Sequence, residues 1–308
     1  IHFPFAKPIE TFCDYVGRVD ILVLNGDLLD CYAISKFSKL YRDSPIEEMI
    51  GARQYLINLI EYILPKKVIV TYGNHCLRLG SYLSSRLDTD IQELLPETAL
   101  DYLFVDGFTH YDRKLKTKTY YEPIREVFDD IKIEYTGNWH CQIFDTIFCH
   151  PKAFASNPMK TAEKAMYFFR NEGKQFKTLV MAHTHRTGSY TIGNTTIYEQ
   201  GAACETDRMN YIDGMLINSQ KQGFIYLCYD KDGNCMPEKT KLITLNEGDY
   251  IIDNKKFDKE YSTQYTPEMK YLLSKGIKYT FVKDINGVTT YKYKKTPELF
   301  EALVSFYK

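Results

Sequence analysis

The 308-residue chain lacks several features that would place it in a common class at once. Its longest apolar runs, such as ILVL at 21–24, are much shorter than the ~20 residues that a membrane-spanning helix needs, and its first ten residues do not resemble a signal peptide. It contains no P-loop, no GxSxG motif and no GxGxxG motif. The sequence therefore predicts a protein without a membrane partner, and its chemistry must come from another pattern.

Neither the net charge nor the spacing of the cysteines points to a particular function. The 39 basic and 40 acidic residues give a net charge of −1, so any nucleic-acid footprint must be local. The eight cysteines are scattered, and no two form a C-x-x-C pair. This pattern favours reduced thiols in the cytoplasm over a disulfide framework or a zinc ribbon.

Two strands and a helix are predicted in the first quarter of the chain. Apolar runs at 20–27 and 67–75 each end in a Gly–Asp or Gly–Asn turn, and the segment 46–64 between them has helical spacing before Pro65. A β-α-β unit makes the two strands parallel, with their carboxyl ends at one edge of the sheet. Residues 78–103 look mostly helical, and 104–135 are mixed.

The second half predicts a further sheet. Strands at 141–151 and 177–185 flank a helix at 156–173, and short strands alternate with turns from 188 to 230. We expect an α/β fold in which this sheet stacks on the first one, with helices outside both.

Metal-binding side chains follow four of these strands. The blocks are Gly26-Asp27-Leu28-Leu29-Asp30, Gly73-Asn74-His75, His150, and Ala182-His183-Thr184-His185. Parallel strands bring their carboxyl ends together, where open α/β sheets bind ligands. A set of carboxylate, amide oxygen and imidazole donors suits divalent metals such as Mn, Fe, Zn or Ni.

In this order, and with Ile1-His2 before them, the blocks resemble the calcineurin-like metallophosphoesterase family. That family carries D-x-H, G-D-x-x-D, G-N-H-[DE], an isolated His and G-H-x-H. The stretches GNHCLRL, YEQGAACE and QKQGF look most like its phage and prophage branch. The resemblance implies a four-layer α/β/β/α sandwich over residues 1–244, and the host cytoplasm as the location of a phage-encoded protein.

The resemblance also implies roles for single residues. Two divalent metal ions are expected, with Mn as first choice and Fe, Zn, Ni or Mg as alternatives. The first would be bound by His2, Asp27 and His185. The second would be bound by Asp27, Asn74, His150 and His183, which makes Asp27 the bridge. His75, oriented by Asp30, would protonate the leaving oxygen, and Arg78 would clamp the phosphate.

Three positions depart from the family pattern. The Asp of D-x-H would precede Ile1, so we expect that acid and its strand in a longer protein. Ala182 replaces a Gly. Cys76 replaces an acid that is not a metal ligand, so we expect it to change the support around His75, and to form an oxidation-sensitive thiolate if it lies near the metals.

The remaining residues predict a linker at 245–266 and a helix-hairpin-helix appendage at 267–308. Residues 269–308 contain eight lysines and three acids, with Tyr271, Tyr279, Tyr291 and Tyr293 interleaved. This region could dock nucleic acid, with lysines on phosphates and tyrosines on bases, or it could be a hairpin with solvated lysines and inward tyrosines.

The predicted function is metal-dependent hydrolysis of a phosphodiester in nucleic acid or a nucleotide. Two alternatives stay open. One is a phosphomonoesterase acting on a phosphoprotein or a small metabolite, and the other is an inactive protein that binds metal for a structural or interaction role. The sequence does not define an oligomeric state.

Overall fold

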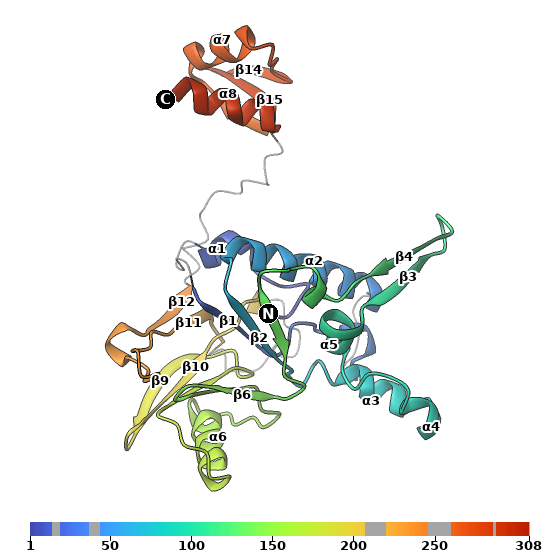
Figure 1. The fold of residues 1–308 in the computed structure, drawn as a ribbon, viewed down its shortest axis with the longest axis vertical. Helices are drawn as coiled ribbons and strands as arrows, with labels where there is room; N and C mark the ends of the chain where they lie inside the picture. The colour runs from blue at the N-terminus through green and yellow to red at the C-terminus, as the bar shows by residue number, and fades with distance from the viewer. Residues whose placement is uncertain (14–18, 37–43, 207–219, 246–259, 286–287, 308) are drawn as a thin grey trace. The chain divides into compact units, whose positions relative to one another are not determined.

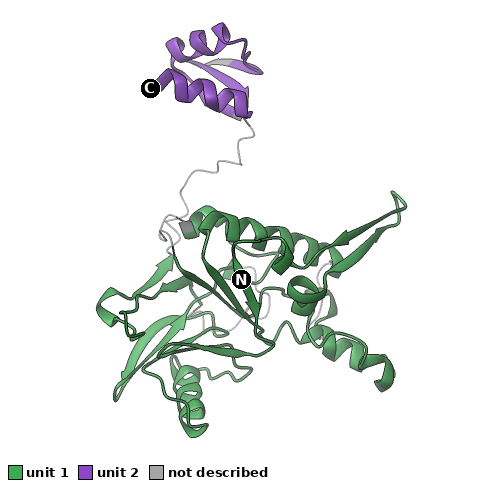
Figure 2. Cartoon of the chain, in the orientation of Figure 1, with its two compact units in different colours: residues 1–245 green, residues 246–308 purple. Residues whose placement is uncertain are grey.

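The computed structural model describes residues 1–308 except 14–18, 37–43, 207–219, 246–259, 286–287 and 308 (Figure 1). Internal contacts divide the chain into two compact units, Ile1–Leu245 and Asn246–Lys308 (Figure 2). In the part of the chain that the structure describes, no helix combines the length and the apolar character needed to cross a bilayer.

The first sheet is parallel and contains β1 (Ile21–Asn25), β2 (Lys67–Thr71) and β5 (Lys132–Tyr135), in that order. Its strands are in register with Val23 opposite Ile69. Since β1 and β2 are joined through a helix, as the β-α-β pattern predicts, their carboxyl ends lie at one edge.

That connecting helix is α2 (Pro45–Ile63). The Ser44 hydroxyl accepts a hydrogen bond from the Glu47 N–H, and Pro45 occupies the first turn, where its missing N–H costs nothing. Leu64 ends the helix in a left-handed conformation before Pro65. The helix therefore covers the predicted segment, with both ends shifted by one residue.

The second sheet has five strands in the order β6-β7-β8-β10-β9. Strands β7, β8 and β10 are parallel, whereas β6 and β9 run antiparallel to their neighbours. The strands are β6 (His140–Ile143), β7 (Thr146–Cys149), β8 (Thr178–Met181), β9 (Thr187–Ile192) and β10 (Thr195–Gln200).

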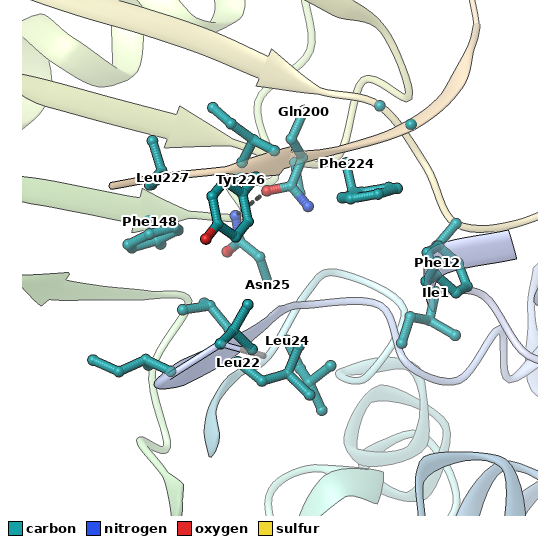
Figure 3. A pocket seen from close by; sticks show the side chains of 18 of the residues that line it. Ile1, Phe12, Leu22, Leu24, Asn25, Phe148, Gln200, Phe224, Tyr226 and Leu227 are labelled. Atoms are coloured by element: carbon teal, nitrogen blue, oxygen red, sulfur yellow. Dashed lines mark hydrogen bonds between the residues drawn. The ribbon is translucent and has the colours of Figure 1, made fainter. Parts of the chain in front are cut away.

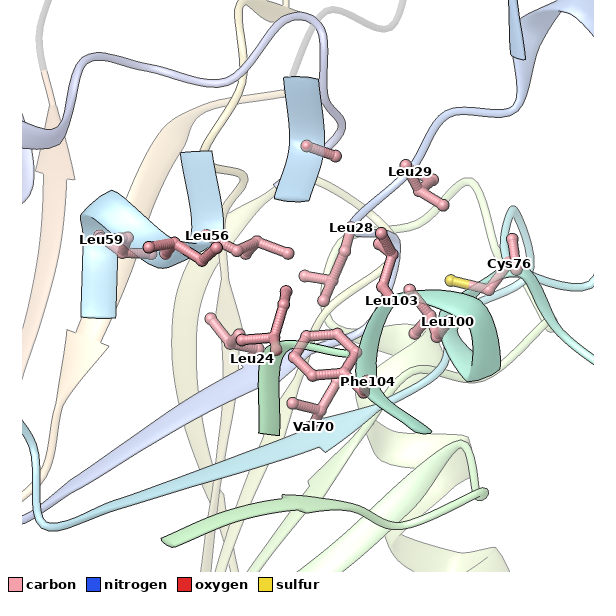
Figure 4. Packing of buried hydrophobic residues seen from close by; sticks show 14 of the residues in the cluster. Leu24, Leu28, Leu29, Leu56, Leu59, Val70, Cys76, Leu100, Leu103 and Phe104 are labelled. Atoms are coloured by element: carbon pink, nitrogen blue, oxygen red, sulfur yellow. The ribbon is translucent and has the colours of Figure 1, made fainter. Parts of the chain in front are cut away.

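Successive side chains of each strand point to opposite faces of its sheet, so each sheet packs on a helix with one face and on the other sheet with the opposite face. Leu24 and Val70 pack against Leu56 of α2, as Figure 4 shows, while Val23 and Ile69 on the opposite face pack against Phe148 and Val180 of the second sheet. The far face of the second sheet packs against α6 (Lys160–Asn171), which lies on the opposite side of the sheets from α2 (Figure 1). The predicted α/β/β/α arrangement is confirmed.

Shorter elements complete the first unit. The segment predicted as mostly helical at 78–103 is a series of short helices, and residues 108–121 form a separate hairpin that contains the basic run 113–118. These elements are α1 (Ile9–Cys13), η1 (Tyr32–Ile34), α3 (Arg78–Ser84), α4 (Thr89–Gln92), α5 (Ala99–Asp101), η2 (Tyr102–Asp106), β3 (Phe108–Asp112), β4 (Thr117–Tyr121), η3 (Ile124–Glu126), β11 (Gln222–Tyr226), η6 (Pro237–Lys239) and β12 (Lys241–Leu245).

The second unit has one strand more than the predicted helix-hairpin-helix. Its elements are β13 (Glu260–Thr263), α7 (Thr266–Ser274), β14 (Phe281–Ile285), β15 (Val288–Lys294) and α8 (Pro297–Tyr307). Strand β13 pairs with β15, so residues 260–263 belong to this sheet rather than to a linker. Most of the predicted linker, 246–259, lies outside the described residues. Tyr293 is fully buried against Leu272 and Leu299, so this tyrosine packs inward.

Candidate metal centre

The predicted site residues meet where the carboxyl ends of four strands converge. Strand β1 leads into Asp27, β2 into Asn74 and His75, β7 into His150, and β8 into His183 and His185. The first two strands belong to the first sheet and the last two to the second, so both sheets contribute to one cluster. His2 joins it from the start of the chain, where its backbone N–H donates to the Asp27 carbonyl oxygen at 2.7 Å.

Asp27 lies at the middle of this cluster and is 2% exposed. Its Oδ2 is 2.9 Å from His150 Nε2, 3.6 Å from His2 Nε2 and 3.9 Å from His75 Nε2. Its Oδ1 accepts the His75 backbone N–H at 2.8 Å. Burial acts to raise the pKa of Asp27, but the surrounding imidazoles of His150 and His75 hold it well below its ordinary value. The carboxylate therefore stays ionised.

Two glycines leave room for this carboxylate and its neighbour. A Cβ atom on Gly73 would collide with the Asp27 carboxylate, and one on Gly26 would collide with the His150 ring. Gly26 also has a φ of +79°, which L side chains rarely adopt. The strand ends can approach each other this closely only because glycine stands at both positions.

The donor atoms form two groups that share Asp27. The donor atoms of His2, Asp27 and His75 lie within 4.8 Å of one another, and so do those of Asp27, His150 and His183. His185 lies beside the first group, with its Nε2 3.1 Å from His2 Nε2. The structure thus brings together five of the predicted ligands, His2, Asp27, His150, His183 and His185, with His75 among them, and Asn74 directly precedes His75.

Several donor atoms are arranged as a bound cation requires. The Oδ1 atom of Asn74 is buried and has no hydrogen-bond partner among the described residues. His150 Nε2 lies 2.9 Å from Asp27 Oδ2 but forms no hydrogen bond there. Its other nitrogen, Nδ1, contacts the Asn25 carbonyl oxygen at 2.9 Å, which fixes the tautomer with Nε2 as the electron-pair donor.

The protonation states also fit a divalent metal. Burial, followed by the nearby charge of His75, lowers the pKa of His2 to about 4, and burial, followed by His150, lowers the pKa of His183 to about 4. Burial also lowers the pKa of His185 well below its ordinary value. Neutral imidazoles, an ionised carboxylate and an amide oxygen are a suitable donor set for a borderline divalent cation.

His75, Asp30 and Arg78 form a second, connected set. His75 Nδ1 is 2.7 Å from Asp30 Oδ1, as predicted for an oriented imidazole. Arg78 Nη1 donates to the Asp30 carbonyl oxygen at 2.6 Å and to Asp30 Oδ1 at 3.1 Å, and Nη2 lies 3.0 Å from His75 Nε2. The guanidinium is therefore held by Asp30 and His75, a placement that the sequence did not predict.

Residues that the sequence analysis missed hold this set in place. Glu48 is buried in α2 and accepts the backbone N–H groups of Asp30 and Cys31 at 2.7 and 2.8 Å. The Asn25 amide donates to the Cys149 carbonyl oxygen at 3.2 Å and so ties the two sheets together beside His150. Glu48 belongs to no sequence motif, so no sequence signal marked it. Asn25 directly precedes the Gly26-Asp27 block, and that position was its only signal.

Cys76 differs from the sequence expectation of a reactive thiolate. Its side chain is fully buried in the apolar cluster with Leu28 and Leu100, where Figure 4 shows it. Burial, followed by the charge of Asp27, raises the pKa of Cys76 to about 12. The residue is therefore a protonated core thiol beneath the site.

Two cavities border the cluster. The larger has a volume of about 730 Å³ and lies between β1 and β11, with Leu22, Leu24, Phe148 and Phe224 on its walls (Figure 3). The smaller has a volume of about 580 Å³ and begins at Asn74 and His150. Because both have residues of the cluster in their linings, either could receive a ligand bound there.

Comparisons with known proteins leave the chain without a family assignment. No protein-family model matches it, and no curated protein matches it. Among solved structures, a single mutant of Vps29 from Entamoeba histolytica is 13% identical at a TM-score of 0.31, covering 73% of this chain and 99% of that one. A conserved uncharacterized protein from Streptococcus pneumoniae TIGR4, titled as a predicted phosphoesterase, is 14% identical at a TM-score of 0.25, covering 77% and 88%. At these TM-scores the two likenesses do not bear on function.

Proposed function

We propose that the chain is a metal-dependent hydrolase that cleaves phosphodiesters of nucleotides or nucleic acid. The observation that carries this proposal is the position of Asp27 between two donor groups, with the Asp30–His75 pair beside them. His2, Asp27 and His185 would hold one divalent cation, and Asp27, Asn74, His150 and His183 a second. Manganese is our first choice among cations that accept this donor set.

Cations held there would supply Lewis acidity, which lowers the pKa of water and offsets phosphate charge. The chain itself places few carboxylates around the position of these cations. Asp27 and Asp30 are the two carboxylates in the described cluster, and the other donors are neutral, so two bound divalent cations would leave the centre net positive toward a phosphate.

His75 is the proton donor in this proposal. Asp30 holds the imidazole through Nδ1, so Nε2 is the atom that can deliver a proton to a leaving oxygen. In the structure Arg78 Nη2 occupies the space beside Nε2 at 3.0 Å. A bound phosphate would attract the guanidinium away from His75, and this movement would free Nε2 to carry a proton while Arg78 binds the phosphate.

Bis-p-nitrophenyl phosphate and p-nitrophenyl phosphate test the proposal. With Mn²⁺ added, we expect the diester to be cleaved faster than the monoester, and a chelator to stop both reactions. Faster cleavage of the monoester would replace the proposal with a phosphomonoesterase. No cleavage of either compound by protein that contains bound metal would replace it with a metal-binding protein without activity.

A further inference from the structure

The smaller cavity continues directly from the candidate metal centre. Its volume of about 580 Å³ lies within the range of sites that enclose organic ligands. Asn74 and His150 belong both to the donor set and to its wall. A ligand whose phosphate lies at the centre can therefore extend the rest of its structure into this space.

Three aromatic side chains line the cavity, and the backbone at two of them is held by hydrogen bonds. Tyr72 donates its N–H to the Asn138 carbonyl oxygen at 3.0 Å, and the Trp139 carbonyl oxygen accepts the His150 N–H at 2.8 Å. Trp139 also stacks on Phe169, with the ring centroids 5.2 Å apart and an interplanar angle of 24°. Such a wall offers rigid π-faces at a defined position relative to His150.

Phe168 adds a third ring to this wall. It lines the cavity, and its ring centroid is 5.6 Å from that of Trp139. Phe168 is 47% exposed, whereas Phe169, the next residue on the helix, is buried. An exposed ring beside the half-buried indole of Trp139 is a surface on which a planar ligand can stack.

Positive charge lies on the same cavity. Lys152 and Lys164 both line it, and no carboxylate belongs to its described lining. The acid closest to Lys164 in the sequence, Glu163, pairs with Lys160 at 2.7 Å. The cavity therefore combines flat apolar surface with unneutralised cationic charge, a combination that fits a ligand with a planar ring and additional phosphate.

We propose that this cavity binds one nucleotide unit of the substrate, with the base against Tyr72, Trp139 and Phe168 and the negative charge toward Lys152 and Lys164. The inference rests on the proposed phosphodiester hydrolysis and names the substrate class of that site. An uncharged apolar ligand would leave both lysines without a counter-charge. A sugar phosphate without a base would leave the rings without a stacking partner.

Trp139 is the single tryptophan of the chain, so its fluorescence reports on the cavity directly. The protein loaded with Mn²⁺ is titrated with AMP, the kind of product that a phosphodiester yields. We expect saturable quenching of Trp139 by AMP and no quenching by ribose 5-phosphate. An absence of quenching by AMP, or competition by ribose 5-phosphate at equal concentration, would overturn the proposal.

Matched variants separate the cavity from the rest of the helix that carries it. Phe168→Ala should weaken AMP binding about tenfold, because stacking on an aromatic ring is lost, whereas Tyr167→Ala, at a similarly exposed neighbouring ring, should leave it unchanged. Lys164→Ala should weaken AMP more than adenosine, and Lys160→Ala should weaken neither. Equal effects within either pair would contradict the assignment.

The same samples distinguish a failure of this inference from a failure of the proposed function. A protein that cleaves bis-p-nitrophenyl phosphate but does not bind AMP would overturn the nucleotide assignment and retain the hydrolase. A protein that binds AMP but cleaves no phosphoester would retain the nucleotide assignment and overturn the hydrolase. Both measurements use the full chain, so a folding defect would appear in each of them.

Discussion

The two cavities that border the candidate metal centre differ in chemistry although they share His150. The larger, between β1 and β11, is walled mainly by leucine, isoleucine and phenylalanine side chains (Figure 3). The smaller carries two lysines and three exposed or half-buried aromatic rings. The larger cavity also reaches the donor residues His2, Asp27 and His183, but the smaller one carries two lysines and no carboxylate in its described lining, which favours the anionic ester there.

From this difference we infer that side chains at the larger cavity contribute mainly to folding and side chains at the smaller cavity mainly to ligand binding. Side chains at the larger cavity, such as Leu24, also belong to the apolar cluster under α2, so they contribute to folding. At the smaller cavity, Lys152, Lys164 and Phe168 are exposed, so substitutions of these side chains should cost little stability.

The largest effect is expected from Asp27→Ala, because this residue belongs to both donor groups. Loss of the shared carboxylate should remove metal from both donor groups and reduce phosphodiester cleavage by about a thousandfold or more. Metal content of the purified protein and the cleavage rate are the measurements. Asp112→Ala, in an exposed hairpin, is the control. An Asp27 variant with full metal content would contradict the central role of this carboxylate.

His75→Ala should reduce cleavage by about 10²–10⁴-fold, because the proton donor is lost. The metal content should remain close to that of the parent, since the expected ligands are all still present. His110→Ala, on β3 away from the cluster, should change neither quantity. A His75 variant that loses its metal would show instead that this imidazole is a ligand, which its place in the first donor group allows.

Leu24→Ala should lower the free energy of unfolding by about 2–5 kcal/mol, because a buried side chain is removed beside an existing cavity. AMP affinity should stay unchanged. Urea denaturation and Trp139 fluorescence measure the two quantities, and Leu115→Ala, at a 72% exposed position, controls for the substitution itself. Weaker AMP binding in the Leu24 variant would show that the larger cavity takes part in binding.

The smallest effect concerns pH and the histidines that line the larger cavity. In the metal-free protein the pKa values of His2 and His183 are about 4, below the ordinary value of about 6.5. The unfolded chain therefore binds more protons than the fold between these values, and stability should fall as the pH decreases from about 6.5 to about 4. Urea midpoints with chelator present measure this trend, and His183→Asn should reduce its slope. A rising midpoint in that window would contradict the buried, neutral state of both imidazoles.

Much of the centre was predictable because its residues directly follow apolar strands. Asp27, Asn74, His150 and the pair His183 and His185 stand in short local patterns, and parallel pairing alone brings strand ends to one edge. The sandwich was predictable for a similar reason. The strands at 20–27 and 177–185 contain continuous apolar runs, so side chains on both faces of each strand must be buried.

The supporting contacts were not predictable, because they join segments far apart in the chain. Glu48 bonds to Asp30 from a helix that carries no motif, and Arg78 reaches Asp30 and His75 rather than open solvent. Trp139 acquires its place through the hydrogen bond to His150 and through ring contacts with Phe168 and Phe169. The state of Cys76 depends on burial, which a motif comparison does not contain.

The convergence of both sheets on one cluster has a thermodynamic consequence. Asp27 and Asn74 follow strands of the first sheet, whereas His150 and His183 follow strands of the second. A cation held by all four would cross-link the layers, and its binding free energy would add to the cohesion of the sandwich. Each tenfold rise in free metal above its dissociation constant would then contribute up to about 1.4 kcal/mol of resistance to unfolding per site. Metal supply would thus set how firmly the two halves of the core stay together.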